Sequence, residues 1–173
     1  PQIFTVRTID LKTNEDNYYK KHYVNINREK FDRWIFSLIG PQVKIITQAT
    51  YKNYRTTSDG YDVDFFYKGK LHTVGTRLLV SAEGALSNVR RSIGLKNDIK
   101  RYISIQDYFK NKEAVPYFTA LFDNDITDFY SWTIPKDDYI ILGSALEEGP
   151  DAVKKFAQLR DQAITQHLVT VAC

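Results

Sequence analysis

The stretch 43-VKIITQATYKNYRTTSDGYDVDFFYKGKLHTVGTRLLV-80 contains runs of alternating side-chain character separated by turn sequences. Asp59-Gly60 and Lys68-Gly69-Lys70 are typical β-hairpin turns, so the stretch predicts an antiparallel meander. Leu78 to Ala82 shows no alternation, which predicts that the last strand is buried on both faces. The three predicted strands are Val43 to Thr56, Tyr61 to Tyr67 and Leu71 to Val80.

A helix is predicted just before the meander. Asn27 is a suitable N-cap, and Ile26 and Phe31 stand at the two positions of a hydrophobic staple. Gly40-Pro41 ends the helix. Apolar residues recur at helical spacing, and we expect this stripe to be core. Its members are Phe31, Trp34, Ile35, Leu38 and Ile39.

A second set of strands and a last helix follow the meander. The helix opens at Gly149-Pro150-Asp151, with Pro at its first position and an acid in its first turn. The fold class is therefore α+β, mostly antiparallel sheet with two or three helices. We expect a division into residues 1–95 and 96–173. The second set of strands is predicted at Arg101 to Phe109, Tyr117 to Phe122, Phe129 to Ile134 and Tyr139 to Gly143.

The composition is that of a soluble globular domain. Of 173 residues, 43% are hydrophobic and 26% charged, and Cys173 and three scattered histidines form no metal-ligand cluster. No apolar run reaches about 18 residues, so a membrane-spanning helix is not expected. We expect an intracellular protein without a metal, and the absence of Met predicts a piece of a longer chain.

Charge is distributed unevenly along the chain. The net charge of +3 is too small to indicate nucleic-acid binding. Residues 87–112 are mainly basic and include Arg90, Lys96 and Lys112, whereas residues 123–151 are strongly acidic. This pattern fits either two solvated faces or a basic stretch that meets a phosphate-bearing ligand.

Common catalytic motifs are absent from the sequence. It contains no GxGxxG, GxxxxGK[ST], HExxH or GxSxG motif. By itself the chain therefore predicts neither a Rossmann dinucleotide-binding domain, a P-loop enzyme, a zinc protease of the HExxH type nor an α/β-hydrolase.

The segment 80-VSAEGALSNVRRSIG-94 can bind a dinucleotide. Gly84 allows close approach to the backbone, Glu83 can accept bonds from hydroxyls, and the start of a helix near Ser87 offers free N–H groups to an anion. The alternative is a strand, a tight turn and a capped helix without a ligand.

This segment resembles the second dinucleotide-contacting motif of the flavoprotein monooxygenases and their relatives, A-D-G-A-x-S-x-V-R-R. Glu83 replaces the Asp, and the other fixed positions match. The resemblance implies cofactor contacts from Glu83, Gly84, Ser87 and Arg90 toward FAD. The matching residues are Ala82, Gly84, Ala85, Ser87, Val89, Arg90 and Arg91.

Two more stretches resemble the same family. The sequence from Val24 to Trp34 is similar to V-x-R-x-x-F-D-x-x-L, which implies that Arg28 lies near the flavin; the alternative is a solvated first-turn arginine. The sequence 130-YSWTIPKDD-138 resembles the Y-x-W-x-F-P-K-G-D…G element of geranylgeranyl reductases. Tyr130, Trp132 and Pro135 are thereby implied to bind an apolar, isoprenoid substrate, although the two rings can instead pack against protein.

The resemblance implies the middle of an FAD-dependent oxidoreductase with a p-hydroxybenzoate hydroxylase-type fold. Its group is that of geranylgeranyl reductases and electron-transferring-flavoprotein dehydrogenases. NAD(P)H or a redox partner protein would reduce the flavin, and the location would be cytoplasmic, including the membrane surface. The family's N-terminal βαβ unit with GxGxxG is not in the sequence. Residues 1–95 would then serve FAD and residues 96–173 the substrate. The alternatives are an aromatic monooxygenase and a non-enzymatic module that binds lipid or protein; no catalytic residue is assigned.

Overall fold

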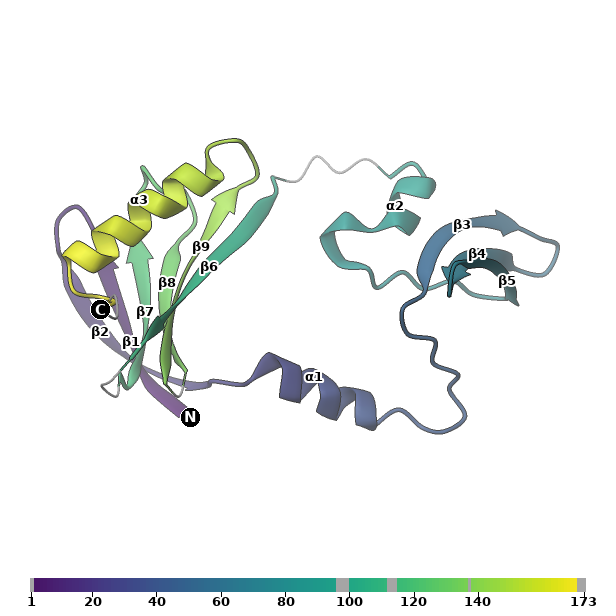
Figure 1. Cartoon of the computed structure of the whole chain (residues 1–173), viewed down its shortest axis with the longest axis horizontal. Helices are drawn as coiled ribbons and strands as arrows, with labels where there is room; N and C mark the ends of the chain where they lie inside the picture. Colours follow the sequence, from purple (N-terminus) through teal and green to yellow (C-terminus); the bar gives the residue numbers. More distant parts are fainter. Residues whose placement is uncertain (1, 96–99, 112–114, 137, 171–173) are drawn as a thin grey trace. The chain divides into compact units, whose positions relative to one another are not determined.

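A computed structural model describes residues 2–95, 100–111, 115–136 and 138–170 (Figure 1). The chain divides into two compact units, which are residues 1–36 with 100–173, and residues 37–99. The boundary at 95/96 expected from the sequence differs from this division, because the first 36 residues join the C-terminal unit. Some residues used in the sequence argument lie outside the described part: Lys96, Lys112, Asp137 and Cys173.

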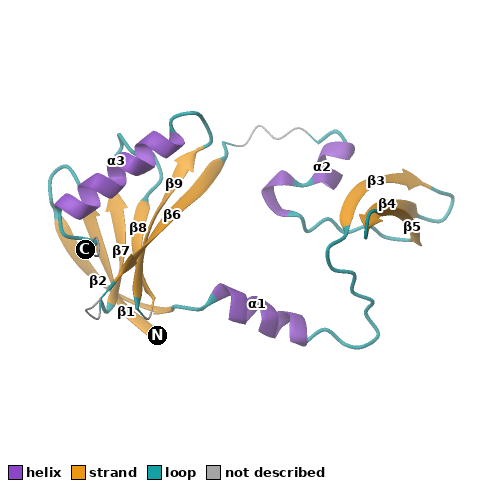
Figure 2. Ribbon diagram, viewed as in Figure 1, coloured by secondary structure: helices purple, strands orange, loops and turns teal. Residues whose placement is uncertain are grey.

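The first unit is built on a mixed sheet (Figure 2). Over the described residues its strand order is β2-β1-β7-β8-β9-β6. Neighbouring strands are antiparallel except β1 and β7, which pair in parallel. The first two strands were not predicted. The bounds are β1 Gln2–Asp10, β2 Asp16–Val24, β6 Tyr102–Lys110, β7 Tyr117–Phe122, β8 Ser131–Lys136 and β9 Tyr139–Glu147.

Helix α3, Ala152–Thr165, packs across one face of this sheet (Figure 1). The helix begins directly after Gly149-Pro150-Asp151, as predicted, but Asp151 is its N-cap and Pro150 precedes it, so the prediction of Pro at the first helical position and an acid in the first turn is wrong. The core lies between this helix and the sheet, where Leu121, Leu142 and Leu159 are fully buried. We call the opposite side of the sheet, which α3 does not cover, the open face.

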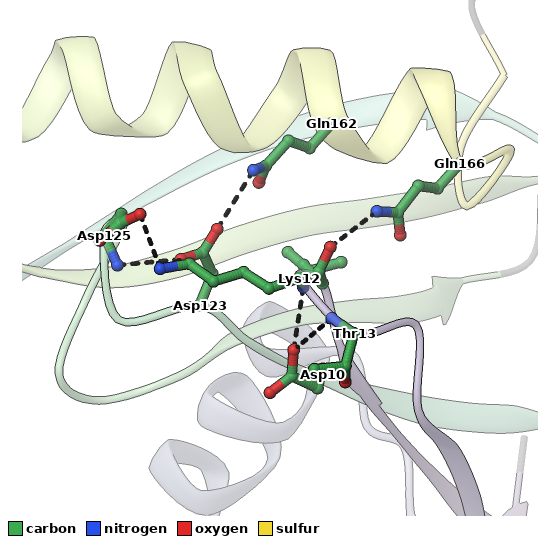
Figure 3. A network of polar contacts seen from close by, with 8 residues as sticks. Asp10, Lys12, Thr13, Asp123, Asp125, Gln162 and Gln166 are labelled. Atoms are coloured by element: carbon green, nitrogen blue, oxygen red, sulfur yellow. Dashed lines mark hydrogen bonds and ion pairs between the residues drawn. The ribbon is translucent and has the colours of Figure 1, made fainter.

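A polar network joins the β1–β2 turn, the β7–β8 loop and α3 (Figure 3). The side chain of Asp123 is 2% exposed. One of its oxygens accepts from the backbone N–H of Asp125 at 2.9 Å, and the other accepts from Nε2 of Gln162 at 3.1 Å. Lys12 Nζ lies 2.7 Å from Asp125 and 3.6 Å from Asp123. The network therefore fixes the loop against the helix.

Helix α1, Arg28–Ser37, begins where the sequence predicted. Oδ1 of Asn27 accepts from the N–H of Lys30 at 3.1 Å, which confirms the N-cap. The prediction that its apolar stripe is core is wrong, because Trp34 is 55% exposed and no residue of the helix is buried. The spacing of the stripe specifies a face of the helix, whereas burial of that face depends on what packs against it.

The second unit contains the predicted meander. Strands β3 (Thr50–Thr56), β4 (Tyr61–Tyr67) and β5 (Lys70–Thr76) pair in order and antiparallel. The pair Tyr67 and Lys70 closes a two-residue turn, as predicted. Asp64 is buried in this sheet.

Both outer strands of the meander are shorter than predicted. Residues 43–49 are not strand, and β5 ends at Thr76. The expected burial of 78–82 is wrong, because Leu78 is 72% and Val80 is 74% exposed. An apolar run forms a buried strand only when neighbouring strands and layers cover it, and here it continues as an irregular segment. A 3₁₀ turn at Gly84–Leu86 and helix α2, Asn88–Ser92, follow.

The described part of the chain thus contains helices α1, α2 and α3 and mostly antiparallel sheets, which confirms the α+β class. Among these helices, none is both long enough and apolar enough to cross a lipid bilayer.

Candidate functional site

The candidate residues fall into two groups. Glu83, Gly84, Ser87 and Arg90 lie in the second unit, on the turn that leads into α2. The other four lie in the first unit, at α1, on β8 and directly before β8. They are Arg28, Tyr130, Trp132 and Pro135.

The turn in the second unit is held by its own polar side chains. Oε2 of Glu83 accepts from Oγ of Ser87 at 2.7 Å, from Oγ of Ser81 at 3.1 Å and from the N–H of Val89 at 3.0 Å. The pKa of Glu83 is therefore lowered, first by the Val89 N–H and then by the Ser87 hydroxyl. Ser87 caps α2, since its Oγ accepts from the N–H of Arg90 at 3.0 Å. Glu83 and Ser87 thus shape the turn.

Gly84 and Arg90 are the members of this group that can face a ligand. Gly84 has φ +74°, a left-handed conformation that favours glycine, and the space where a Cβ would lie is open within 4 Å. Arg90 Nη2 donates to the carbonyl of Ala85 at 2.5 Å, whereas its buried Nε has no hydrogen-bond partner among the described residues.

A hollow of about 290 Å³ lies at this turn. A guanidinium beside an open glycine suits a phosphate or another anionic group, because arginine donates several hydrogen bonds in a fixed geometry. The residues therefore fit the phosphate part of a dinucleotide. The lining residues are Ser81, Glu83, Gly84, Ser87, Val89, Arg90, Ile93 and Leu95.

Tyr130 and Trp132 lie on the open face of the first unit. Trp132 is half-buried, while Ser131 and Thr133, which alternate with it, are buried on the α3 side. Alternation along a strand places the two aromatic side chains on one face of the sheet. Their ring centroids are 5.8 Å apart and meet edge to face. This arrangement agrees with the face that the sequence pattern predicted.

Two aromatic residues that the sequence analysis missed extend this pair into an aromatic row. Phe129 stacks on Tyr130 with ring centroids 4.8 Å apart, and Tyr102 lies 5.4 Å from Phe129. Tyr102 is on strand β6, far from β8 in the sequence, so only the fold brings it here. Phe129 directly precedes Tyr130 in the sequence, so it was the one member of the row that a local pattern could have predicted. The aromatic row is Tyr102, Phe129, Tyr130 and Trp132.

Pro135 and the start of α1 are held together. The side-chain amide of Asn25 donates to the carbonyl of Pro135. Lys136 Nζ donates to Oδ1 of Asn25 and, at 2.8 Å, to the carbonyl of Ile26. Helix α1 therefore starts at the end of β8. Arg28 is 77% exposed and lies 3.6 Å from Asp32, an arrangement that agrees with a solvated first-turn arginine and leaves it accessible to a ligand.

A hollow larger than the one at the α2 turn lies elsewhere. It measures about 670 Å³ and runs along α3, lined by residues of that helix, such as Lys154 and Gln158, and by its C-cap Gln166. It contains none of the candidate residues. The candidate residues therefore form two separate groups, one at the α2 turn of the second unit and one on the open face of the first unit.

The fold is that of part of several flavoproteins. The chain superimposes with a TM-score of 0.76 on a geranylgeranyl bacteriochlorophyll reductase-like protein from Thermoplasma acidophilum, at 15% identity, covering 96% of this chain and 46% of that one. A flavoprotein/dehydrogenase from Cytophaga hutchinsonii gives 0.68 at 13% identity, with 94% and 44% covered. The myxobacterial chondrochloren halogenase CndH, an FAD-dependent halogenase, gives 0.64 at 13% identity, with 96% and 42% covered.

In sequence the chain is similar to bacterial proteins named CbrA. It is 38% identical over 162 residues to protein CbrA of Escherichia coli O9:H4 strain HS, which covers 94% of this chain and 44% of the relative. The CbrA of Shigella sonnei strain Ss046 is also 38% identical, with 94% and 46% covered. The chain thus spans less than half the length of these curated relatives. No protein-family model matches it.

Proposed function

We propose that this chain is the central, mainly substrate-binding part of an FAD-dependent oxidoreductase. The enzyme would be a reductase or dehydrogenase that acts on an apolar, isoprenoid substrate. The observation that carries the proposal is the aromatic row on the open face, in a chain whose fold matches that of a geranylgeranyl reductase-like protein. The names of the dehydrogenase and halogenase neighbours support a flavin-dependent full-length protein.

The substrate side of the proposal rests on Tyr130, Trp132 and Pro135. Aromatic rings that line an open sheet face offer a large apolar surface, and such surfaces with few polar groups are typical of small-molecule sites. An isoprenoid chain offers no strong hydrogen-bonding group along its length, so ring packing would hold it. A protein that works on such a substrate would be cytoplasmic and can meet it at a membrane surface.

The cofactor side rests on the turn at α2. Arg90, which lines the hollow, would hold an FAD phosphate through its guanidinium group, Gly84 would admit the cofactor to the backbone, and Glu83 with Ser87 would keep the turn in shape. Arg28, exposed at the start of α1, would face the flavin. When bound, FAD supplies hydride or electron transfer, with NAD(P)H or a redox partner protein as the source. We assign the FAD-facing role to residues within 1–95 and the substrate-facing role to residues within 96–173.

The test is whether the full-length protein encoded by the gene of this chain retains flavin during purification. We expect it to purify with bound FAD, identified by absorbance and by mass after release. Arg90→Ala should lose most of the flavin, whereas Arg160→Ala, an exposed arginine of α3, should retain it. A colourless full-length protein would contradict the proposed cofactor. Equal flavin retention by both variants would contradict the proposed role of Arg90.

A further inference from the structure

Gly143 lies against the indole ring of Trp132. The two residues are cross-strand partners on β9 and β8, so their side-chain positions share the open face. A Cβ built on Gly143 would lie 2.5 Å from both Cε2 and Nε1 of Trp132 and 2.7 Å from Cζ2. These distances are far below van der Waals contact, so any side chain at position 143 would displace the ring.

The backbone does not explain a glycine at this position. The glycines with positive φ in the described chain do not include Gly143, which lies within strand β9 between two buried residues. Glycine inside a strand weakens it and often marks close approach of another group. Here the approaching group is the indole, and packing of an aromatic ring over a strand glycine is a known way to restore the lost contacts.

The indole packs against the strand at a cost. Nε1 of Trp132 is buried and has no hydrogen-bond partner among the described residues. A free indole would turn this N–H toward water or an acceptor. The indole thus packs against Gly143 even though its N–H makes no hydrogen bond with the described residues.

We propose that Gly143 is a positioning residue. Because it has no side chain, the indole of Trp132 packs against β9, and we call this contact the seat. The seat fixes how far the ring of Trp132, and with it the aromatic row, stands above the sheet. The role of that row in substrate binding rests on the proposed function, whereas the seat itself does not. Without the seat, the indole would stand away from the sheet and occupy the space where an apolar chain would lie.

The seat is tested by Gly143→Ala in a Trp34→Phe background, where Trp132 is the single tryptophan. We expect the emission of Trp132 to move to longer wavelength and its near-ultraviolet circular dichroism to weaken. Gly149→Ala is the matched control, since a Cβ there meets nothing within 4 Å, and it should leave both signals unchanged. Unchanged signals in Gly143→Ala would overturn the proposal.

A double-mutant cycle keeps the test valid if Gly143→Ala folds poorly. In a Trp132→Leu background the clash is removed, so Gly143→Ala should no longer lower the urea midpoint. An equal loss in both backgrounds would show a backbone role and overturn the seat.

Binding separates this inference from the proposed function. Geraniol should change Trp132 fluorescence in the Trp34→Phe chain, and Gly143→Ala should weaken its apparent affinity by about tenfold, the scale of one misplaced apolar group in a pocket. If geraniol has no effect on the Trp34→Phe chain with Gly143 intact, this counts against the isoprenoid substrate. The emission wavelength of Trp132 and the double-mutant cycle would still test the seat. A normal affinity in Gly143→Ala would overturn the effect of the seat on the row.

Discussion

Removal of the Asp123 carboxylate should destabilise the first unit. This buried group accepts two hydrogen bonds, from the Asp125 N–H at 2.9 Å and from Gln162 at 3.1 Å. Hydrogen bonds to a charged group contribute about 1.5–3 kcal/mol each, and the cost of burying the carboxylate offsets part of this. The contact with Lys12 at 3.6 Å adds little, because that lysine is half exposed. We expect Asp123→Ala to lower the free energy of unfolding by about 2–4 kcal/mol.

Asp123→Asn should be milder because Gln162 can adapt. Oε1 of Gln162 is buried without a partner among the described residues, so rotation of its amide lets this oxygen accept from the new Asn amide. The remaining carbonyl oxygen still accepts from Asp125 N–H. We expect a loss of about 1 kcal/mol, close to one neutral hydrogen bond.

Urea denaturation followed by circular dichroism measures these differences. Asp125→Asn is the control, since its side chain is 67% exposed and its ion pair with Lys12 contributes about 0.2–1 kcal/mol. The reasoning is refuted if Asp123→Ala unfolds within about 0.5 kcal/mol of the parent, the range of ordinary surface changes. If Asp123→Asn is as unstable as Asp123→Ala, the amide rotation is wrong.

Two other changes test the core and the acid response. Leu159→Ala, at a fully buried position of α3, should lower the free energy of unfolding by about 2–5 kcal/mol. Its control is Val153→Ala, at a position 73% exposed on the same helix, which should change this free energy by no more than about 0.5 kcal/mol. Equal melting temperatures of the two variants would contradict the packing of α3. The pKa of Asp64 is lowered from its ordinary value of 3.8, first by the Thr73 hydroxyl at 2.7 Å and then by Arg55. The ionised Asp64 therefore stabilises the fold fully above pH 3.8, and this stabilisation is lost as the pH falls through the lower pKa of the folded state. Thr73→Val should raise that pKa and move acid unfolding to higher pH, and a carboxyl NMR titration that places the parent Asp64 midpoint at or above 3.8 would rule this out.

Local sequence signals predicted elements well where the decisive contacts are short in range. The N-cap at Asn27 and the bounds of β4 and β7 follow from neighbouring residues. The side of β8 that carries Trp132 follows from alternation alone. Such features depend on backbone chemistry and side-chain period within one segment, and the sequence states both directly.

Long-range pairing could not be predicted in this way. Strand β1 inserts in parallel beside β7, which lies more than 100 residues later, and no local pattern encodes that partner. The aromatic row has the same origin, because Tyr102 comes from a distant strand. The sequence also left open whether Glu83 and Ser87 hold their own turn or contact a ligand, since their residue types fit both roles.

The sequence by itself determined the α+β class, the meander turns, and which residue types stand at the α2 turn and on β8. Only the tertiary structure decided that the α1 stripe is exposed, that Gly143 lies against Trp132, and that Nε of Arg90 is buried without a hydrogen-bond partner among the described residues. The physical reason is that periodicity specifies the direction of a side chain, whereas burial, clash and hydrogen-bond satisfaction depend on what another part of the chain places there.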